Sequence, residues 1–177
     1  MKITSVSRLA AILSLACTAA LGAQQVTKQN VEGIRNLARL ETTVACAGTI
    51  TTDALPEIKK MGFASVINLR EASEPGADIA QEEAAARAAG LRFYHVPFNG
   101  TKPDPKSADQ FLQVITSNGA EPAFIHCAGG NRAAAMWLIK RIAVDHWDVD
   151  RASTEATALG LTSNALKEWS IEYAQKH

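Results

Sequence analysis

The apolar residues of this chain follow two spacings, and the spacing changes several times along the sequence. Short continuous apolar runs ended by glycine or polar residues predict buried strands, whereas apolar residues three and four positions apart predict helices that bury one face. Strands are predicted over residues 43–47, 64–69, 91–96 and 123–126. Helices are predicted over residues 31–40, 53–61, 78–89, 107–116, 133–144, 149–158 and 163–175.

This alternation of strands and helices predicts an α/β fold. Its expected form is a mostly parallel central sheet of about four to five strands with helices on both faces, built by residues 24–177 as a single domain. Ligands of such sheets bind beyond the carboxyl ends of the strands. We therefore expect three loops to meet there: the loop at Cys127, the loop after Leu69 with Arg70 and Glu71, and residues 97–105.

The most informative segment is residues 124–132, where an apolar strand pattern ends in His126 and Cys127 and a helix pattern follows. Between Cys127 and Arg132 lie Ala128, Gly129, Gly130 and Asn131. Glycines let a backbone approach a ligand closely, and the N–H groups at a helix start attract anions. The pattern predicts an anion-binding loop that uses these four amides and the planar fork of Arg132.

Cys127 in such a loop is expected to act as an activated nucleophile. The helix start, Arg132 and the adjacent His126 all favour a thiolate, so His126 is a supporting residue. The plainer alternative is a small buried hydrophobic residue followed by glycines that only turn the chain.

The first 23 residues have the pattern of a signal peptide, with Lys2 and Arg8 before a short apolar run and small residues after it. The run is too short to span a bilayer. Export predicts a periplasmic or extracellular location, and Ser14 makes lipid attachment at Cys17 a poor match. Removal of the leader takes two of the 18 basic and none of the 18 acidic residues, leaving a net charge of −2. We expect a monomer that binds no nucleic acid.

Two cysteines remain after the leader, Cys46 and Cys127. In an oxidising compartment they could form a disulfide, which requires Cα atoms within about 7 Å. A disulfide would occupy the predicted nucleophile, so we favour free thiols and keep a reversible redox bond as the alternative.

Three segments together resemble the cysteine-dependent protein tyrosine and dual-specificity phosphatase superfamily, and within it the phosphatase-like domain of beta-lactamase hydrolase-like proteins. They are residues 62–70, the strand end at Val96 and Pro97, and residues 126–132. The resemblance implies Cys127 as nucleophile, Arg132 as phosphate clamp and loop amides from Ala128 to Asn131.

The sequence departs from that superfamily at two positions. Its usual loop has five residues between Cys and Arg where this chain has four, a length also found in rhodanese-like proteins. Ala133 replaces the Ser or Thr whose hydroxyl supports the leaving thiolate. Ser65 or Thr101 could supply such a hydroxyl from elsewhere.

The predicted function is hydrolysis of phosphate monoesters, on a small phosphorylated substrate or a phosphoprotein, through a cysteinyl-phosphate. Asp104 is the candidate general acid, with a turn or helix-cap role as the alternative, and Glu71 is the second candidate acid. Two other functions stay open: a rhodanese-like sulfurtransferase with a Cys127 persulfide, and a non-catalytic anion-binding or redox-sensing domain. No metal or cofactor is expected, because the chain has neither zinc-ligand spacing nor a nucleotide fingerprint.

Overall fold

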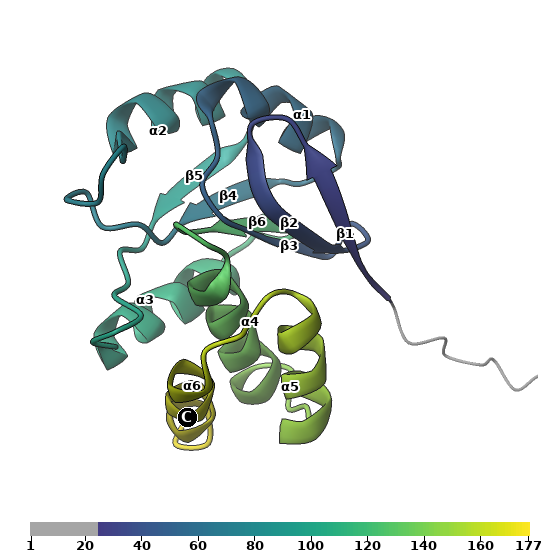
Figure 1. Ribbon diagram of the computed structural model, residues 1–177, viewed down its shortest axis with the longest axis vertical. Coiled ribbons are helices and arrows are strands. Elements are labelled where there is room, and N and C mark those ends of the chain that lie inside the picture. The colour runs from purple at the N-terminus through teal and green to yellow at the C-terminus, as the bar shows by residue number, and fades with distance from the viewer. Residues whose placement is uncertain (1–24) are drawn as a thin grey trace, which may run out of the picture.

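The computed structural model describes residues 25–177 and is shown in Figure 1. The predicted signal peptide and Cys17 lie outside the described residues. Six strands form one sheet in the order β1-β2-β3-β6-β4-β5. They are β1 (Val26–Val31), β2 (Ile34–Leu40), β3 (Val44–Ala47), β4 (Ser65–Asn68), β5 (Arg92–His95) and β6 (Ala123–His126).

The predicted α/β fold and its mostly parallel sheet are confirmed, with one strand more than expected. Strands β3, β6, β4 and β5 run parallel, and β6 lies between β3 and β4 in the middle of the sheet. Strands β1 and β2 extend one edge as an antiparallel hairpin. All four residues of β6 are buried, as a central parallel strand covered on both faces requires.

Helices cover both faces of the sheet (Figure 1). The short η1 (Thr52–Ala54), α1 (Leu55–Lys60) and α2 (Ile79–Ala88) lie on one face, where Leu55, Ile58 and Phe63 form a core with Phe124. The other face carries α3 (Pro105–Ile115), α4 (Asn131–Ala143), α5 (Val149–Ala158) and α6 (Asn164–Ala174). Helix α4 is central to that layer and is buried over residues 133–141.

The helix predicted over residues 31–40 is wrong, because this segment holds the end of β1, a turn and strand β2. Asn36 has a left-handed backbone, with φ of +52°, in the middle of the strand. The irregular residue breaks the alternation of a strand, so Ile34, Leu37, Ala38 and Leu40 are buried at spacings that imitate a helix. Strand β1, which pairs with β2, was not predicted.

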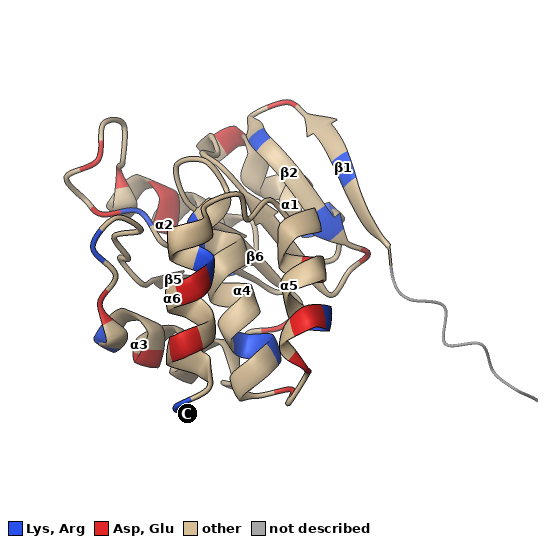
Figure 2. Cartoon of the chain, turned by 60° about the horizontal axis from the view of Figure 1, so that its bottom comes forward, with Lys and Arg blue, Asp and Glu red and all other residues tan. Residues whose placement is uncertain are grey.

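Acidic and basic residues are interspersed along the helices in the view of Figure 2. Among residues 25–177, none of the helices has the length and apolar content that a membrane crossing requires.

Candidate active site

Cys127 directly follows β6, at the carboxyl end of the central strand. Its side chain is buried, with 1% of the residue surface exposed. The backbone N–H of Gly130 donates a hydrogen bond to Cys127 Sγ over 3.1 Å. The sulfur therefore faces an amide of the loop, as the sequence predicts for a stabilised thiolate.

The loop is fixed from outside through its carbonyl groups. Ala128 O accepts from the Thr49 backbone N–H over 3.3 Å, and Gly129 O accepts from Asn36 Nδ2 over 3.1 Å. Gly130 has φ of +104°, a conformation that favours glycine, and α4 begins directly after it. The loop thus turns sharply between β6 and α4 with its carbonyls directed toward β2 and the segment after β3.

Asn131, predicted to contribute a loop amide, also uses its side chain. Its Oδ1 accepts from the backbone N–H groups of Thr162 and Ser163 over 2.8 and 2.9 Å. These residues precede α6, so the first residue of α4 ties the loop to the helical layer.

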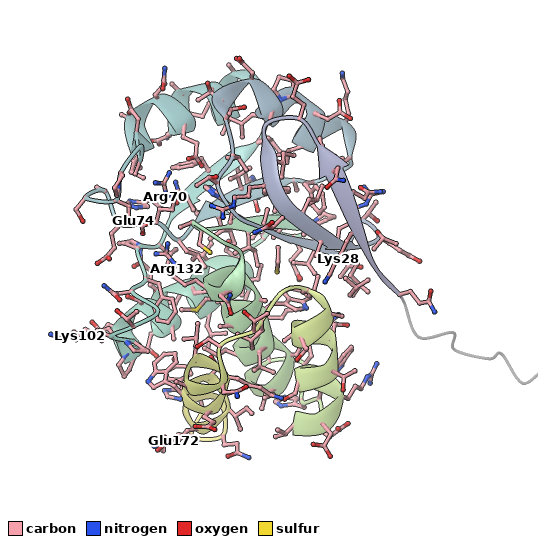
Figure 3. The ribbon with its side chains drawn as sticks, viewed as in Figure 1. Lys28, Arg70, Glu74, Lys102, Arg132 and Glu172 are labelled. Carbon is pink, nitrogen blue, oxygen red and sulfur yellow. The ribbon has the colours of Figure 1, made fainter. Side chains whose placement is uncertain are left out.

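Arg132 is the most extensively bonded side chain of the site. Its Nη1 donates to Leu69 O, Phe98 O and Glu74 Oε1 over 3.2, 2.8 and 2.6 Å, and Nη2 donates to Glu74 Oε2 over 2.9 Å. Because Leu69 and Phe98 follow β4 and β5, the three predicted loops do converge here. Figure 3 shows Arg132, Glu74 and Arg70 gathered at this edge.

These bonds leave one edge of the guanidinium without an oxygen acceptor, and the Arg132 side chain also hydrogen-bonds Cys127. Arginine has five N–H donors in a fixed plane. Nε–H and the second hydrogen of Nη2 have no oxygen acceptor among residues 25–177, and they lie on the same edge of the fork. That edge can hold two oxygens of a phosphate or sulfate.

Charge at the site is balanced by Glu74. Partial burial disfavours its charged form, but hydrogen bonds from Arg132 and the Glu71 amide outweigh this and lower the pKa of Glu74 to about 2. Burial likewise opposes the charge of Arg132, yet the hydrogen bond to Glu74 and attraction to Cys127 raise its pKa. Arg132 therefore stays charged next to the sulfur.

Glu74 was not predicted as a site residue. Its Oε1 also accepts from the Glu71 N–H over 2.8 Å, and Arg70 Nε lies 3.5 Å from its Oε2. Arg70 is itself buried and donates to the carbonyls of Pro75 and Gly76. The only signal in the sequence was an acidic residue in the predicted loop after Arg70.

His126 contacts a buried carboxylate rather than the loop. Its Nε2 lies 2.7 Å from Glu82 Oε1, and the other oxygen of Glu82 accepts from Asn68 Nδ2 over 2.9 Å. Glu82 belongs to α2, so this contact fastens the helix of one face to strands β4 and β6. The amphipathic pattern of α2 gave no sign that one of its acids turns inward.

The two candidate acids occupy different places. Asp104 is the exposed N-cap of α3 and accepts from the Lys106 N–H over 3.0 Å, which is the capping role left open by the sequence. Glu71 instead lines a cavity of about 430 Å³ beside Arg132, and its Oε2 accepts from Asn99 Nδ2 over 3.0 Å. Asp104 does not line this cavity, and its predicted acid role stays a prediction.

Both described cysteines are free. Cys46 lies on β3 beside Ile125 of β6, and it is fully buried. Burial, followed by the charge of Cys127, raises the pKa of Cys46 well above its ordinary value. Cys46 therefore remains a neutral thiol at neutral pH.

The hydroxyl that Ala133 lacks has one remaining candidate. Ser65 lies at the start of β4, the end of the strand opposite Cys127, and donates to Ala120 O. Thr101 lines the cavity beside Arg132 and donates to Asn99 Oδ1 over 2.8 Å.

A column of stacked side-chain rings packs against the loop whose carbonyl binds Arg132. Phe98, whose carbonyl accepts from Arg132, packs its ring on Trp169 with centroids 5.6 Å apart. Trp169 stacks on Tyr173 at 5.5 Å, and Tyr173 stacks on His177 at 4.2 Å. Helix α6 thereby buttresses the loop after β5.

The mostly parallel sheet, with Cys127 after its central strand and Arg132 at the start of the next helix, is that of an α/β domain of the phosphatase-like class. The chain belongs to the family described as beta-lactamase hydrolase-like protein, phosphatase-like domain, whose model matches residues 36–144. A beta-lactamase hydrolase-like protein of Xylella fastidiosa is 30% identical over 131 residues, 71% of this chain. The chain spans 30% of the length of that relative.

Solved structures of phosphatases share the fold. The core catalytic domain of the PP-IP phosphatase SIW14 from S. cerevisiae superposes with a TM-score of 0.65 at 14% identity, covering 81% of this chain and 88% of that one. A cysteine-to-serine variant of P. aeruginosa TpbA in complex with pTyr superposes with a TM-score of 0.57 at 19% identity, covering 85% and 86%.

Proposed function

We propose that this chain is an exported cysteine-dependent phosphatase that hydrolyses phosphate monoesters through a cysteinyl-phosphate on Cys127. One observation carries the proposal. The Gly130 amide donates to Cys127 Sγ over 3.1 Å, while Arg132 hydrogen-bonds the same cysteine and keeps one edge of its guanidinium free of oxygen acceptors. A nucleophile and a clamp for phosphoryl oxygens therefore meet at the end of the central strand.

In the first step the thiolate of Cys127 attacks phosphorus, and the S–P bond forms as the ester O–P bond breaks. The loop amides and Arg132 stabilise the charge on the three equatorial oxygens. The leaving oxygen takes a proton from an acid at the cavity wall, for which Glu71 has the better position. Water then attacks phosphorus and gives a proton to the carboxylate formed in the first step, the S–P bond breaks, and thiolate and inorganic phosphate are released.

The substrate is proposed to be a phosphorylated small molecule or a phosphorylated side chain, including phosphotyrosine. The cavity beside Arg132 has room for such a group, and its wall offers the polar side chains of Asn99, Thr101 and Ser163 alongside Leu166. The pTyr complex of the TpbA variant, a neighbour in fold, supports the choice.

Purified protein assayed on p-nitrophenyl phosphate tests the proposal. We expect phosphate release that is abolished in Cys127→Ser, and a loss of about 10²-fold or more in Arg132→Lys, because a point charge does not replace a planar fork. Quenched samples should contain phosphate covalently bound to Cys127. Thiocyanate formation from thiosulfate and cyanide without phosphate release would instead establish the sulfurtransferase, whose four-residue loop this chain shares.

A further inference from the structure

Asn36 has a strained backbone beside the catalytic loop. Its φ of +52° lies in the left-handed region, which is uncommon for residues other than glycine and is unusual within a strand. Asparagine tolerates this conformation better than most residues, and strained residues cluster at functional sites. We therefore looked to the contacts of the Asn36 side chain for the cause of this left-handed conformation.

The carboxamide of Asn36 donates from Nδ2 to Gly129 O over 3.1 Å, a contact between residues 93 positions apart. Gly129 O and the Gly130 N–H belong to one peptide group, and in a trans peptide they point in opposite directions. The Gly130 N–H of this same group donates to Cys127 Sγ. A bond on one side of the peptide thus fixes the donor on the other side.

The Gly129 backbone pairs with Gly48 in an isolated antiparallel bridge, and the Asn36 side chain adds a bond on the carbonyl side of the same peptide. Gly129 and Gly130 lack side chains that restrict rotation, and a Cβ added at Gly129 would meet no atom within 4 Å. A flipped peptide would turn the Gly129 carbonyl oxygen toward the sulfur, where it would repel the thiolate and the oxygens of a bound phosphate. The neighbouring Ala128 carbonyl is held by the Thr49 backbone.

We propose that Asn36 is a positioning residue of the nucleophile: it holds the Gly129–Gly130 peptide with its N–H toward Cys127 Sγ. The inference rests on the proposed function, because the peptide matters to catalysis only if Cys127 reacts. Asn36 touches neither sulfur nor substrate and acts through Gly130. Its side chain is exposed at a second cavity of about 480 Å³, so water competes for the bond and its effect is moderate.

Two variants separate the hydrogen bond from the strained backbone. Asn36→Gly keeps the left-handed conformation at no steric cost but removes the donor, so the melting temperature should not fall. Asn36→Asp keeps the shape but offers no donor, and its carboxylate repels the Gly129 oxygen. We expect kcat/KM for p-nitrophenyl phosphate to drop about 3- to 10-fold in Asn36→Gly and at least as much in Asn36→Asp.

Asn30→Asp is the matched control. Asn30 lines the same cavity without a bond to the loop, and its substitution makes the same change of charge. A readout independent of turnover is the amide proton resonance of Gly130, which should move upfield in both Asn36 variants and stay in place in Asn30→Asp. Wild-type kcat/KM together with an unmoved Gly130 resonance in both variants would overturn the inference.

The experiments distinguish a failure of the proposed phosphatase function from a failure of the positioning role of Asn36. A wild-type protein without phosphatase activity would sink the proposed function, and the Gly130 resonance alone would then decide the role of Asn36. A shifted resonance supports that role for whichever reaction Cys127 performs, and an unmoved one ends it.

Discussion

Glu74 binds the guanidinium of Arg132 by two hydrogen bonds, from Nη1 to Oε1 over 2.6 Å and from Nη2 to Oε2 over 2.9 Å. This pairing directs the open edge of the fork away from Glu74. It also links the stability of the fold to pH, because Glu74 has a pKa of about 2 against an ordinary 4.5.

The first prediction concerns that pH dependence. Ionised Glu74 stabilises the fold fully at pH values above about 4.5, and its contribution is lost as the pH falls from 4.5 to about 2. Its side chain keeps 18% of its surface exposed, so solvent screening reduces the contribution to about 1–3 kcal/mol. Urea unfolding at a series of pH values should show a flatter profile for Glu74→Gln than for the wild type.

Glu172→Gln is the control for this experiment, since the exposed Glu172 also pairs with a cation, Lys176, but lies outside the site. Lys176 also lowers the pKa of Glu172, but solvent screens this exposed pair, so the profile should stay close to that of the wild type. Parallel wild-type and Glu74→Gln curves would show that the Arg132 pair does not couple to folding.

The second prediction concerns the buried contact of Glu82 with His126 and Asn68. Glu82→Ala leaves His126 Nε2 and Asn68 Nδ2 without their acceptor in the interior, so the free energy of unfolding should fall by about 2–4 kcal/mol. Glu82→Gln keeps part of the bonding and should lose less. Glu83→Ala changes a partly exposed residue, breaks only a pair with Arg87, and should alter stability by less than about 0.5 kcal/mol. Equal losses at positions 82 and 83 in chemical denaturation would contradict the assignment.

The third prediction compares the two loop glycines. Gly130→Ala forces a Cβ into a left-handed backbone with φ of +104° and should cost about 1–2 kcal/mol of stability. A Cβ at Gly129 would enter open space, and the backbone there has no positive φ, so Gly129→Ala should cost much less. Thermal unfolding of both variants measures the difference, and a reversed order would mean that the turn is not held at Gly130.

The fourth prediction separates the two candidate acids. Asparagine caps helices as well as aspartate, so Asp104→Asn should leave the stability of α3 unchanged. It should change kcat by no more than about twofold. Glu71→Gln keeps the shape of the cavity wall but cannot transfer a proton, and kcat should fall about 10²-fold. A loss of that size in Asp104→Asn would return the acid role to the residue that the sequence favoured.

Local sequence patterns predicted most of the fold. Strand β6, helix α5 and the turn at Cys127 lie at or next to their predicted positions, because continuous apolar runs, helical spacing and paired glycines are local signals. The β1–β2 hairpin was missed for an equally local reason, since the backbone of Asn36 converts the burial pattern of a strand into one that resembles a helix.

The site was only half predictable. Cys127 and Arg132 are encoded by one short segment, whereas Glu74 and Glu82 meet their partners across 58 and 44 residues. Neither pairing leaves a periodicity in the sequence: Glu74 reaches Arg132 where loops converge at the sheet edge, and Glu82 reaches His126 where α2 packs on the sheet. Asp104 shows the converse, because an acid flanked by prolines fits a catalytic loop and a helix cap equally well.

The ring column places a natural fluorophore, the indole of Trp169, close to the Arg132 site. The Phe98 carbonyl anchors Arg132, and the Phe98 ring rests on the indole of Trp169. We therefore expect a ligand that shifts the guanidinium to change the fluorescence of Trp169 through the Phe98 ring, without an added label. Trp169→Phe should remove this signal while Trp137 and Trp147 continue to emit.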